Sequence, residues 1–292
     1  MKTSTCFVTV VFPENIIYFE DFVSSINRQT CKEFHLLIYN DGVVGLVSMI
    51  GIINVKFSVV DLPEGLSIAD NRTFVLENLR NSEFKYAVFG DSDDYFPSNR
   101  VEVNRKYLED YDVVVNDIHL VNMNKDLLIS DYFELENNKE INFIDLKDKN
   151  CCGLGNTAIQ ITSLPENITF NSSIAAVDWM LYSRILLEAK AAIYTNETFI
   201  YYRQHHLNAI GLKSITKDRL MQGVGIKLNH YKNLEKEFKI CKVELMEFRK
   251  LSHFCKKEEN LDNYLEKILS LNLNRPMWWE EIKTLKELKI KG

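Results

Sequence analysis

Short apolar runs alternate with amphipathic stretches through the first 90 residues of the chain. The apolar runs are rich in β-branched and aromatic residues and are closed by Pro, Gly or Asp, which is typical of buried strands. The first run, 6–12, ends at Pro13, and we interpret it as a strand and not as a signal peptide, because no small-residue cleavage pattern follows it. The other predicted strands here are 34–39, 54–62 and 86–89, and the predicted helices are 18–29 and 68–79.

The order of these elements predicts the fold class. Strand, helix and strand in units of this length favour an α/β fold with a mostly parallel sheet and helices on both of its faces. Residues 213–292 have a helical pattern instead. We therefore divide the chain into a sheet domain, 1–212, and a helical, basic C-terminal extension, 213–292.

Acidic residues follow two of the predicted strands, where parallel sheets bind their ligands. Asp41 lies in an Asn-Asp-Gly sequence after the second strand, and Asp91, Ser92, Asp93 and Asp94 follow the fourth. Three carboxylates in four residues repel one another unless a cation lies among them or water surrounds them. Oxygen ligands of this kind suit Mg²⁺ or Mn²⁺, although Asp and Ser also favour ordinary turns. The position of the cluster after a central strand favours the metal site.

The composition excludes several classes of protein. The chain is 46% hydrophobic and 26% charged, and its longest nearly uncharged apolar run, 43–53, is too short to span a membrane. None of the six cysteines lies in a Cys-x-x-Cys pair or at zinc spacing from a histidine, so we expect reduced thiols in a cytoplasmic protein. Residues 213–292 carry 18 basic and 12 acidic side chains, whereas residues 1–212 carry 17 and 29. The acidic body suits divalent cations, and nucleic-acid binding is not expected.

The last predicted helix is amphipathic. Ile282, Leu285 and Leu288 recur every three residues after Trp278 and Trp279, with lysines between them. This is the composition of an interfacial helix, which would hold the protein at the inner face of the cytoplasmic membrane as a peripheral contact. A helix that packs its apolar stripe on the sheet domain or on another subunit fits the pattern equally well.

Several motifs, taken in order, resemble those of a known family, the inverting glycosyltransferases of family 2, which have the A-type nucleotide-binding fold. The resemblance covers roughly residues 4–212. Its motifs are Ser-Ile-x-x-Gln-Thr at 25–30, Asn-Asp-Gly at 40–42, Asp-Asn-Arg at 70–72, Asp-x-Asp at 91–93, Cys-Gly and Asn-Thr within 152–157, Val-Asp-Trp at 177–179, and Tyr-Arg-x-His at 202–205 with Asn208 and Gly211. The last motif is similar to a stretch common among bacterial rhamnosyl and related transferases.

The resemblance implies where a nucleotide sugar would bind. Asp41 would accept a hydrogen bond from the ring N–H of a pyrimidine base, and Asn71 and Arg72 would position the nucleotide. Asp91 would accept a hydrogen bond from a ribose hydroxyl, and Ser92 is assigned to the same site. Two of these assignments have a structural alternative, namely an ordinary turn for Asp41 and an ion pair within its own helix for Arg72.

The resemblance also implies which residues take part in the reaction. Asp93 and His205 would ligate a Mn²⁺ or Mg²⁺ ion that bridges the diphosphate, and Arg203 would contact the diphosphate. Asp178 would be the general base that takes the proton of the acceptor hydroxyl as this attacks the anomeric carbon. Asp178 equally fits the N-cap of an apolar helix predicted for 179–189, and His205 and Arg203 also fit structural positions.

The prediction from the sequence is therefore a metal-dependent inverting glycosyltransferase. The resemblance implies transfer from a UDP- or dTDP-sugar to a glycan acceptor, lipid-linked, in the assembly of a bacterial surface polysaccharide such as O-antigen or capsule. A nucleotidyltransferase would carry a Gly-rich basic loop after its first strand, where residues 12–16 of this chain are Phe-Pro-Glu-Asn-Ile. A non-catalytic module that binds a nucleotide sugar or a carbohydrate is the alternative, because it could keep Asp41 and Asp91 without a base.

Overall fold

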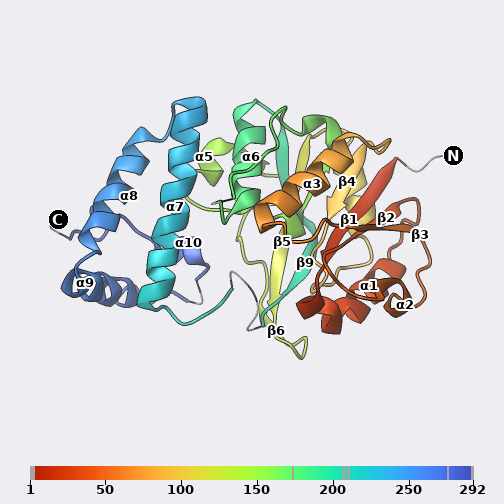
Figure 1. Cartoon of the computed structure of the whole chain (residues 1–292), viewed down its shortest axis with the longest axis horizontal. Coiled ribbons are helices and arrows are strands. Elements are labelled where there is room, and N and C mark those ends of the chain that lie inside the picture. The colour runs from red at the N-terminus through yellow and green to blue at the C-terminus, as the bar shows by residue number, and fades with distance from the viewer. Residues whose placement is uncertain (1–3, 173, 206–207, 209–210, 275, 291–292) are drawn as a thin grey trace. The chain divides into compact units, whose positions relative to one another are not determined.

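The structure is a computed structural model that describes residues 4–172, 174–205, 208, 211–274 and 276–290. The chain divides into two compact units, which Figure 1 shows as ribbons. The sheet unit comprises residues 1–172 and 177–207, and the helical unit comprises residues 173–176 and 208–292.

The sheet unit holds all the strands of the described residues. They are β1 (Thr5–Val11), β2 (His35–Asn40), β3 (Lys56–Asp61), β4 (Tyr86–Phe89), β5 (Val113–Val121), β6 (Leu127–Ile129), β7 (Glu140–Ile141), β8 (Thr157–Gln160) and β9 (Ala192–Arg203). The α-helices of this unit are α1 (Phe19–Asn27), α2 (Leu46–Met49), α3 (Ile68–Arg80), α4 (Arg100–Tyr107), α5 (Phe143–Leu146) and α6 (Val177–Leu187). Short 3₁₀ helices cover Pro13–Tyr18, Leu154–Asn156 and Ile161–Ser163.

The strands form one sheet in the order β3-β2-β1-β4-β8-β5-β9-β7, with β6 paired to β5. The pairs of β1 with β2, β2 with β3, β1 with β4 and β5 with β9 are parallel. Helices α1 and α3 connect strands in opposite directions along the sheet, so right-handed crossovers place them on opposite faces. The predicted α/β class is confirmed. The antiparallel strand β8, which lies between β4 and β5, was not predicted.

Strand β1 lies at the centre of the core. All seven of its residues are buried, as expected for a strand covered on both faces. The ring centroid of Phe7 lies 5.8 Å from that of Phe22 in α1 and 5.2 Å from that of Phe96. The side chain of Gln29, just after α1, donates to the carbonyl of Pro97 at 2.8 Å and accepts from the N–H of Val101 at 3.0 Å. These bonds tie the end of α1 to the segment that follows the acidic cluster.

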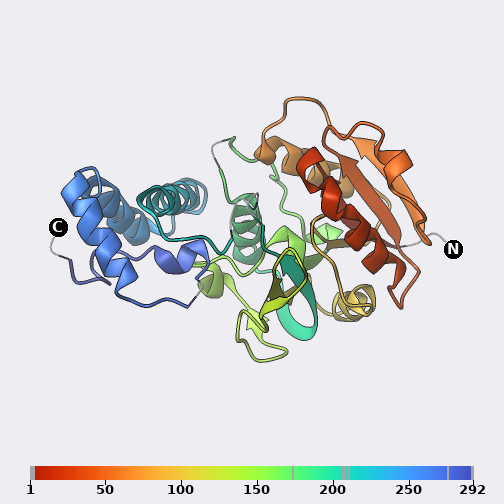
Figure 2. The same ribbon diagram turned by 90° about the horizontal axis from the view of Figure 1, so that it is seen from below.

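The helical unit contains α7 (Lys217–Phe238), α8 (Lys242–Phe254), α9 (Glu258–Leu269) and α10 (Trp278–Glu281). Figure 2 shows α7, α8 and α9 side by side. Gly223 of α7 lets the C-terminal segment approach closely, because a Cβ there would lie 2.6 Å from Cγ1 of Ile282. Among the described residues, no helix has the length and apolar character that crossing a membrane requires.

The predicted C-terminal amphipathic helix is wrong. Helix α10 ends at Glu281, and Ile282 has an extended backbone with φ −102° and ψ 103°. Ile282 and Leu285 are 1% and 8% exposed, and the hydroxyl of Tyr264 accepts from the N–H of Lys283 at 3.1 Å. The segment therefore packs its apolar side chains inside the helical unit, because α7 and α9 offer it both apolar contact and a backbone hydrogen bond.

Candidate functional site

A tight turn after β4 carries the acidic cluster. A Cβ at Gly90 would lie 2.6 Å from the ring of Phe96 and 2.7 Å from that of Phe7, so only glycine fits there without displacing the rings. The N–H of Asp94 donates to the carbonyl of Asp91 at 3.2 Å and closes the turn. The cluster thus lies at the carboxyl end of β4, the edge where such sheets bind ligands.

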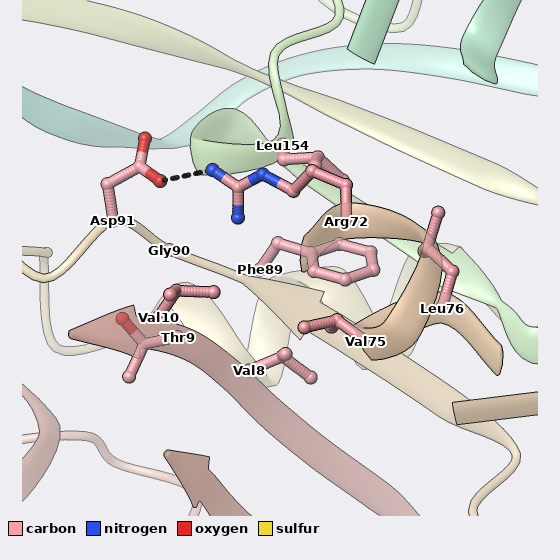
Figure 3. A pocket seen from close by; sticks show the side chains of 10 residues that line it. All are labelled: Val8, Thr9, Val10, Arg72, Val75, Leu76, Phe89, Gly90, Asp91 and Leu154. Carbon is pink, nitrogen blue, oxygen red and sulfur yellow. Dashed lines mark ion pairs between the residues drawn. The ribbon is translucent and has the colours of Figure 1, made fainter. Parts of the chain in front are cut away.

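Asp91 and Arg72 of α3 point toward one another across a pocket (Figure 3). Nη2 of Arg72 lies 3.8 Å from Oδ1 of Asp91, and the two side chains are 26% and 40% exposed. Burial raises the pKa of Asp91 to about 6; Arg72 opposes this shift, and the charges of Asp93 and Asp178 add to it. The remaining pocket residues are Val8, Thr9, Val10, Val75, Leu76, Phe89, Gly90 and Leu154. An open pair above a largely apolar floor can bind a polar ligand through either partner.

Asp41 and Asn71 are also brought together. Nδ2 of Asn71 donates to Oδ2 of Asp41 at 2.8 Å. Asn71 is 7% exposed, and its Oδ1 has no hydrogen-bond partner among the residues that the structure describes. Ser92 is 1% exposed, and its hydroxyl likewise has no hydrogen-bond partner in the described part of the chain. Buried polar atoms without partners are costly in a native protein, which makes these two candidates for ligand contacts.

Asp93 and His205 form a buried pair. Nε2 of His205 lies 2.8 Å from Oδ2 of Asp93, and the side chains are 2% and 11% exposed. The ring of Tyr18 stacks on that of His205 with centroids 4.9 Å apart. His205 follows the end of β9, and Asp93 follows β4, so the sheet brings together two residues that are 112 positions apart.

The side chains of Asp93 and His205 are suited to supply two ligands to a divalent cation whose other ligands come from water and a phosphate group. In the described part of the chain, no three His, Cys, Asp or Glu side chains form a group that could hold a metal ion. Protein sites for Mg²⁺ commonly supply only one or two carboxylates and take the other ligands from water and substrate phosphates. One carboxylate oxygen and one imidazole nitrogen at hydrogen-bond distance are ligands that Mn²⁺ accepts.

Arg203 lies inside the protein, with 1% of its surface exposed. Its Nη2 pairs with Asp21 of α1 at 2.7 Å, and its Nε donates to the carbonyl of Asp93 at 2.8 Å. Its guanidinium carbon lies 4.7 Å from the ring centre of Tyr18. Its backbone N–H donates to Oδ1 of Asp94 at 2.8 Å. These contacts favour a supporting role, in which Arg203 holds the acidic turn, over the direct diphosphate contact predicted from the sequence.

Asp178 lies in the first turn of α6, which begins at Val177. The predicted start of this helix at Trp179 was late, and Asp178 is within the helix and not at its N-cap. Its Oδ1 accepts from the N–H of Trp179 at 2.9 Å. Burial raises the pKa of Asp178, while this hydrogen bond and the charge of Arg72 oppose the rise. A raised pKa makes a carboxylate a stronger base.

One short segment contacts both Asp91 and Asp178. A Cβ at Gly155 would lie 2.5 Å from Oδ2 of Asp91, and a Cβ at Gly153 would lie 3.6 Å from Oδ2 of Asp178. The family motifs in the sequence include Gly153 but not Gly155, Asp21 or Tyr18. The Gly-x-Gly spacing is a signal that could have pointed to Gly155, whereas nothing local marks the other two.

No protein-family model and no curated protein matches the sequence. Several solved structures do have a similar fold. Staphylococcus aureus TarS 1–349 in complex with UDP-GlcNAc has a TM-score of 0.57 and 13% identity, over 86% of this chain and 71% of that chain. A longer S. aureus TarS structure has a TM-score of 0.57 and 14% identity, over 85% and 42%. The mannosyltransferase PcManGT from Pyrobaculum calidifontis in complex with GDP-Man and Mn²⁺ has a TM-score of 0.55 and 13% identity, over 80% and 64%.

This chain therefore spans less than half of the longer TarS chain and less than two thirds of the mannosyltransferase. At this level of identity the similarity is one of fold. The chain has the fold of these TarS and mannosyltransferase structures.

Proposed function

We propose that this protein is a metal-dependent inverting glycosyltransferase that transfers a sugar from a nucleoside diphosphate sugar to a glycan acceptor. The observation that carries the proposal is the convergence of three acidic groups at one edge of the sheet. Asp91 and Asp178 both lie beside the segment from Gly153 to Gly155, and Asp93 is paired with His205 at 2.8 Å. The fold supports it, since structures with UDP-GlcNAc and with GDP-Man and Mn²⁺ share that fold.

The donor would bind along α3 and the acidic turn, within a catalytic domain of residues 1–212. The Asp41–Asn71 pair offers an acceptor and an amide donor to the pyrimidine base of a UDP- or dTDP-sugar. Asp91 would accept from the ribose, with Ser92 beside it. Asp93 and His205 would hold Mn²⁺ or Mg²⁺, which would neutralise charge on the departing diphosphate.

Asp178 would act as the single base. It would take the proton of the acceptor hydroxyl, and an inverting transfer needs no second carboxylic acid because the diphosphate is already a good leaving group. From the resemblance of the motifs, the acceptor is a lipid-linked glycan of a bacterial surface polysaccharide. The protein would then work in the cytoplasm, at the inner face of the membrane, with its basic helical extension near the lipid surface.

The donor site is tested by titration calorimetry of UDP, dTDP, GDP and CDP, each with and without Mn²⁺. We expect metal-dependent binding of one pyrimidine diphosphate to the wild type, loss of binding in Asp93→Ala, and weaker binding in His205→Gln. The matched controls are Asp131→Ala and His119→Gln, because these two residues form another His–Asp pair, 3.5 Å apart, between β5 and the residues that follow β6. No binding of any nucleotide to the folded wild type would overturn the proposal.

The base is tested with Asp178→Asn. We expect donor affinity to stay within about twofold while turnover of the sugar nucleotide, measured as release of the nucleoside diphosphate, falls by about 10²–10⁴-fold. Unchanged turnover would remove Asp178 from the reaction. A wild type that binds the donor with metal but never turns it over with any glycan would favour the non-catalytic binding module.

A further inference from the structure

Arg100 is a buried cation beneath the acidic turn. It is the first residue of α4 and is 0% exposed. Among the described residues, no carboxylate forms an ion pair with it. A buried charge without a carboxylate partner is costly. Packing alone therefore does not explain why an arginine occupies position 100.

Its hydrogen bonds go to backbone carbonyls on two different segments. Nη2 donates to the carbonyl of Phe89 at 2.6 Å and to that of Gly155 at 2.7 Å. Nε lies 3.4 Å from Oδ1 of Asn116, and the guanidinium carbon lies 4.3 Å from the ring centre of Phe96. One nitrogen therefore joins the end of β4 to the segment after Gly153.

Both segments carry the candidate acidic residues. Phe89 and Gly90 lead directly to Asp91, and Gly155 lies against the carboxylate of Asp91. Gly153, two residues before Gly155, lies next to Asp178. A change in the distance between the two carbonyls would therefore move Asp91 relative to Asp178.

We propose that Arg100 is a positioning residue that sets the separation between Asp91 and Asp178. The inference rests on the proposed function of these carboxylates as the donor-binding group and the base. The nearby negative charges also help to retain the buried cation. Burial lowers the pKa of Arg100 to about 9, and Asp94 and Asp91 oppose this shift, so the side chain stays charged at neutral pH.

Lysine cannot reproduce this contact. Its ammonium is a compact point charge, whereas the planar guanidinium presents several donors in a fixed geometry. Arg100→Lys therefore keeps the charge and removes the bridge. Arg184→Lys is the matched control, because Arg184 is 4% exposed and its Nη1 donates to the carbonyls of Asn167 at 3.2 Å and Thr169 at 3.1 Å.

The test uses protein labelled with ¹⁵N-glycine and two readouts. We expect Arg100→Lys to shift the amide signals of Gly90 and Gly155 and to lower the affinity for the nucleoside diphosphate with Mn²⁺ by about tenfold. Arg184→Lys should leave both glycine signals in place and change the affinity by less than about threefold. Unmoved Gly90 and Gly155 signals in a folded Arg100→Lys protein, or unchanged affinity, would overturn the proposal.

Two further outcomes remain informative. If the wild type binds no nucleotide, the proposed function fails, while the glycine signals still decide whether Arg100 joins the two segments. If Arg100→Lys does not fold, Gly155→Ala disturbs the same junction from the other side, because its Cβ would press on Asp91. A folded Gly155→Ala protein with wild-type affinity would overturn the positioning role.

Discussion

Two arginine–carboxylate pairs in this protein have opposite geometries. In the helical unit, Nε and Nη2 of Arg219 contact the two oxygens of Glu281 at 2.7 Å and 2.6 Å, and Glu281 is 0% exposed. In the sheet unit, a single nitrogen of Arg72 approaches Asp91 at 3.8 Å, with both side chains partly exposed. The closed pair satisfies its own charges, whereas the open pair leaves hydrogen-bonding capacity for a ligand. Removing a partner should therefore cost stability in the first case and binding in the second.

The largest expected effect on stability is that of Glu281→Gln. This change leaves Arg219 as an uncompensated buried charge, so the free energy of unfolding of the helical unit should fall by about 3–5 kcal/mol. Denaturant unfolding followed by circular dichroism measures it. Glu258→Gln is the control, because Glu258 forms an exposed pair with Lys217 at 3.3 Å and should cost less than about 1 kcal/mol. Equal losses of stability in Glu281→Gln and Glu258→Gln would contradict the distinction between closed and open pairs.

Two glycines of α7 test how closely the C-terminal segment packs against this helix. Alanine at Gly223 would collide with Ile282, so we expect Gly223→Ala to lower the free energy of unfolding by about 1–3 kcal/mol. Gly225 has open space around its Cβ position, and Gly225→Ala should raise the free energy of unfolding by up to about 1 kcal/mol through helix propensity. Both are measured by denaturant titration. The same sign for the two variants would mean that Ile282 does not pack against Gly223.

The buried His230 of α7 predicts a dependence on pH. Burial lowers its pKa to about 3, and the charge of Lys227 adds to this. The unfolded chain takes up a proton at its ordinary pKa of about 6.5 and the native protein does not, so acid favours unfolding. Between pH 7.5 and pH 5 this group should remove about 2 kcal/mol of stability. His230→Gln should lose that part of the slope, and parallel slopes in the two proteins would contradict the prediction.

The smallest effect on stability is expected at the open pair of Arg72 and Asp91. Arg72→Met should weaken metal-dependent nucleotide binding by about tenfold and change the free energy of unfolding by less than about 1 kcal/mol. Arg105→Met is its control, since Arg105 faces Glu33 at 3.6 Å on the surface and should change neither quantity. A large loss of stability in Arg72→Met would make this pair structural, like that of Arg219.

Much of the fold follows from local patterns in the sequence. The strand predicted for 86–89 coincides with β4, and the helix predicted for 68–79 differs from α3 by one residue, because apolar spacing and Pro or Gly stops act over short distances. The motifs predicted that Asp41 and Asn71 belong to one site and that Asp93 and His205 belong to one metal site, and the structure brings each pair within hydrogen-bond distance. The roles given to these residues stay predictions.

The rest depends on contacts between distant parts of the chain. The spacing of Ile282 and Leu285 fits a helix, but the space at Gly223 and the hydroxyl of Tyr264 select an extended segment. Arg203 matched a motif that suggested a ligand contact, yet Asp21, 182 residues away, holds its guanidinium inside the protein. Such partners are invisible in a local pattern, because each is set by three-dimensional packing.

His205 lies far along the sequence, and this affects the order in which side-chain pairs form while the ribosome makes the chain. Strand β9 pairs in parallel with β5, which ends about 70 residues earlier in the chain, and such distant pairing forms slowly because chain closure must precede the contact. Domains fold as the ribosome extends the chain by about 5–20 residues per second. The Asp41–Asn71 pair can form once the first four strands have emerged, but Asp93 must wait several seconds more for its partner. A nascent chain would therefore form the Asp41–Asn71 pair before the Asp93–His205 pair.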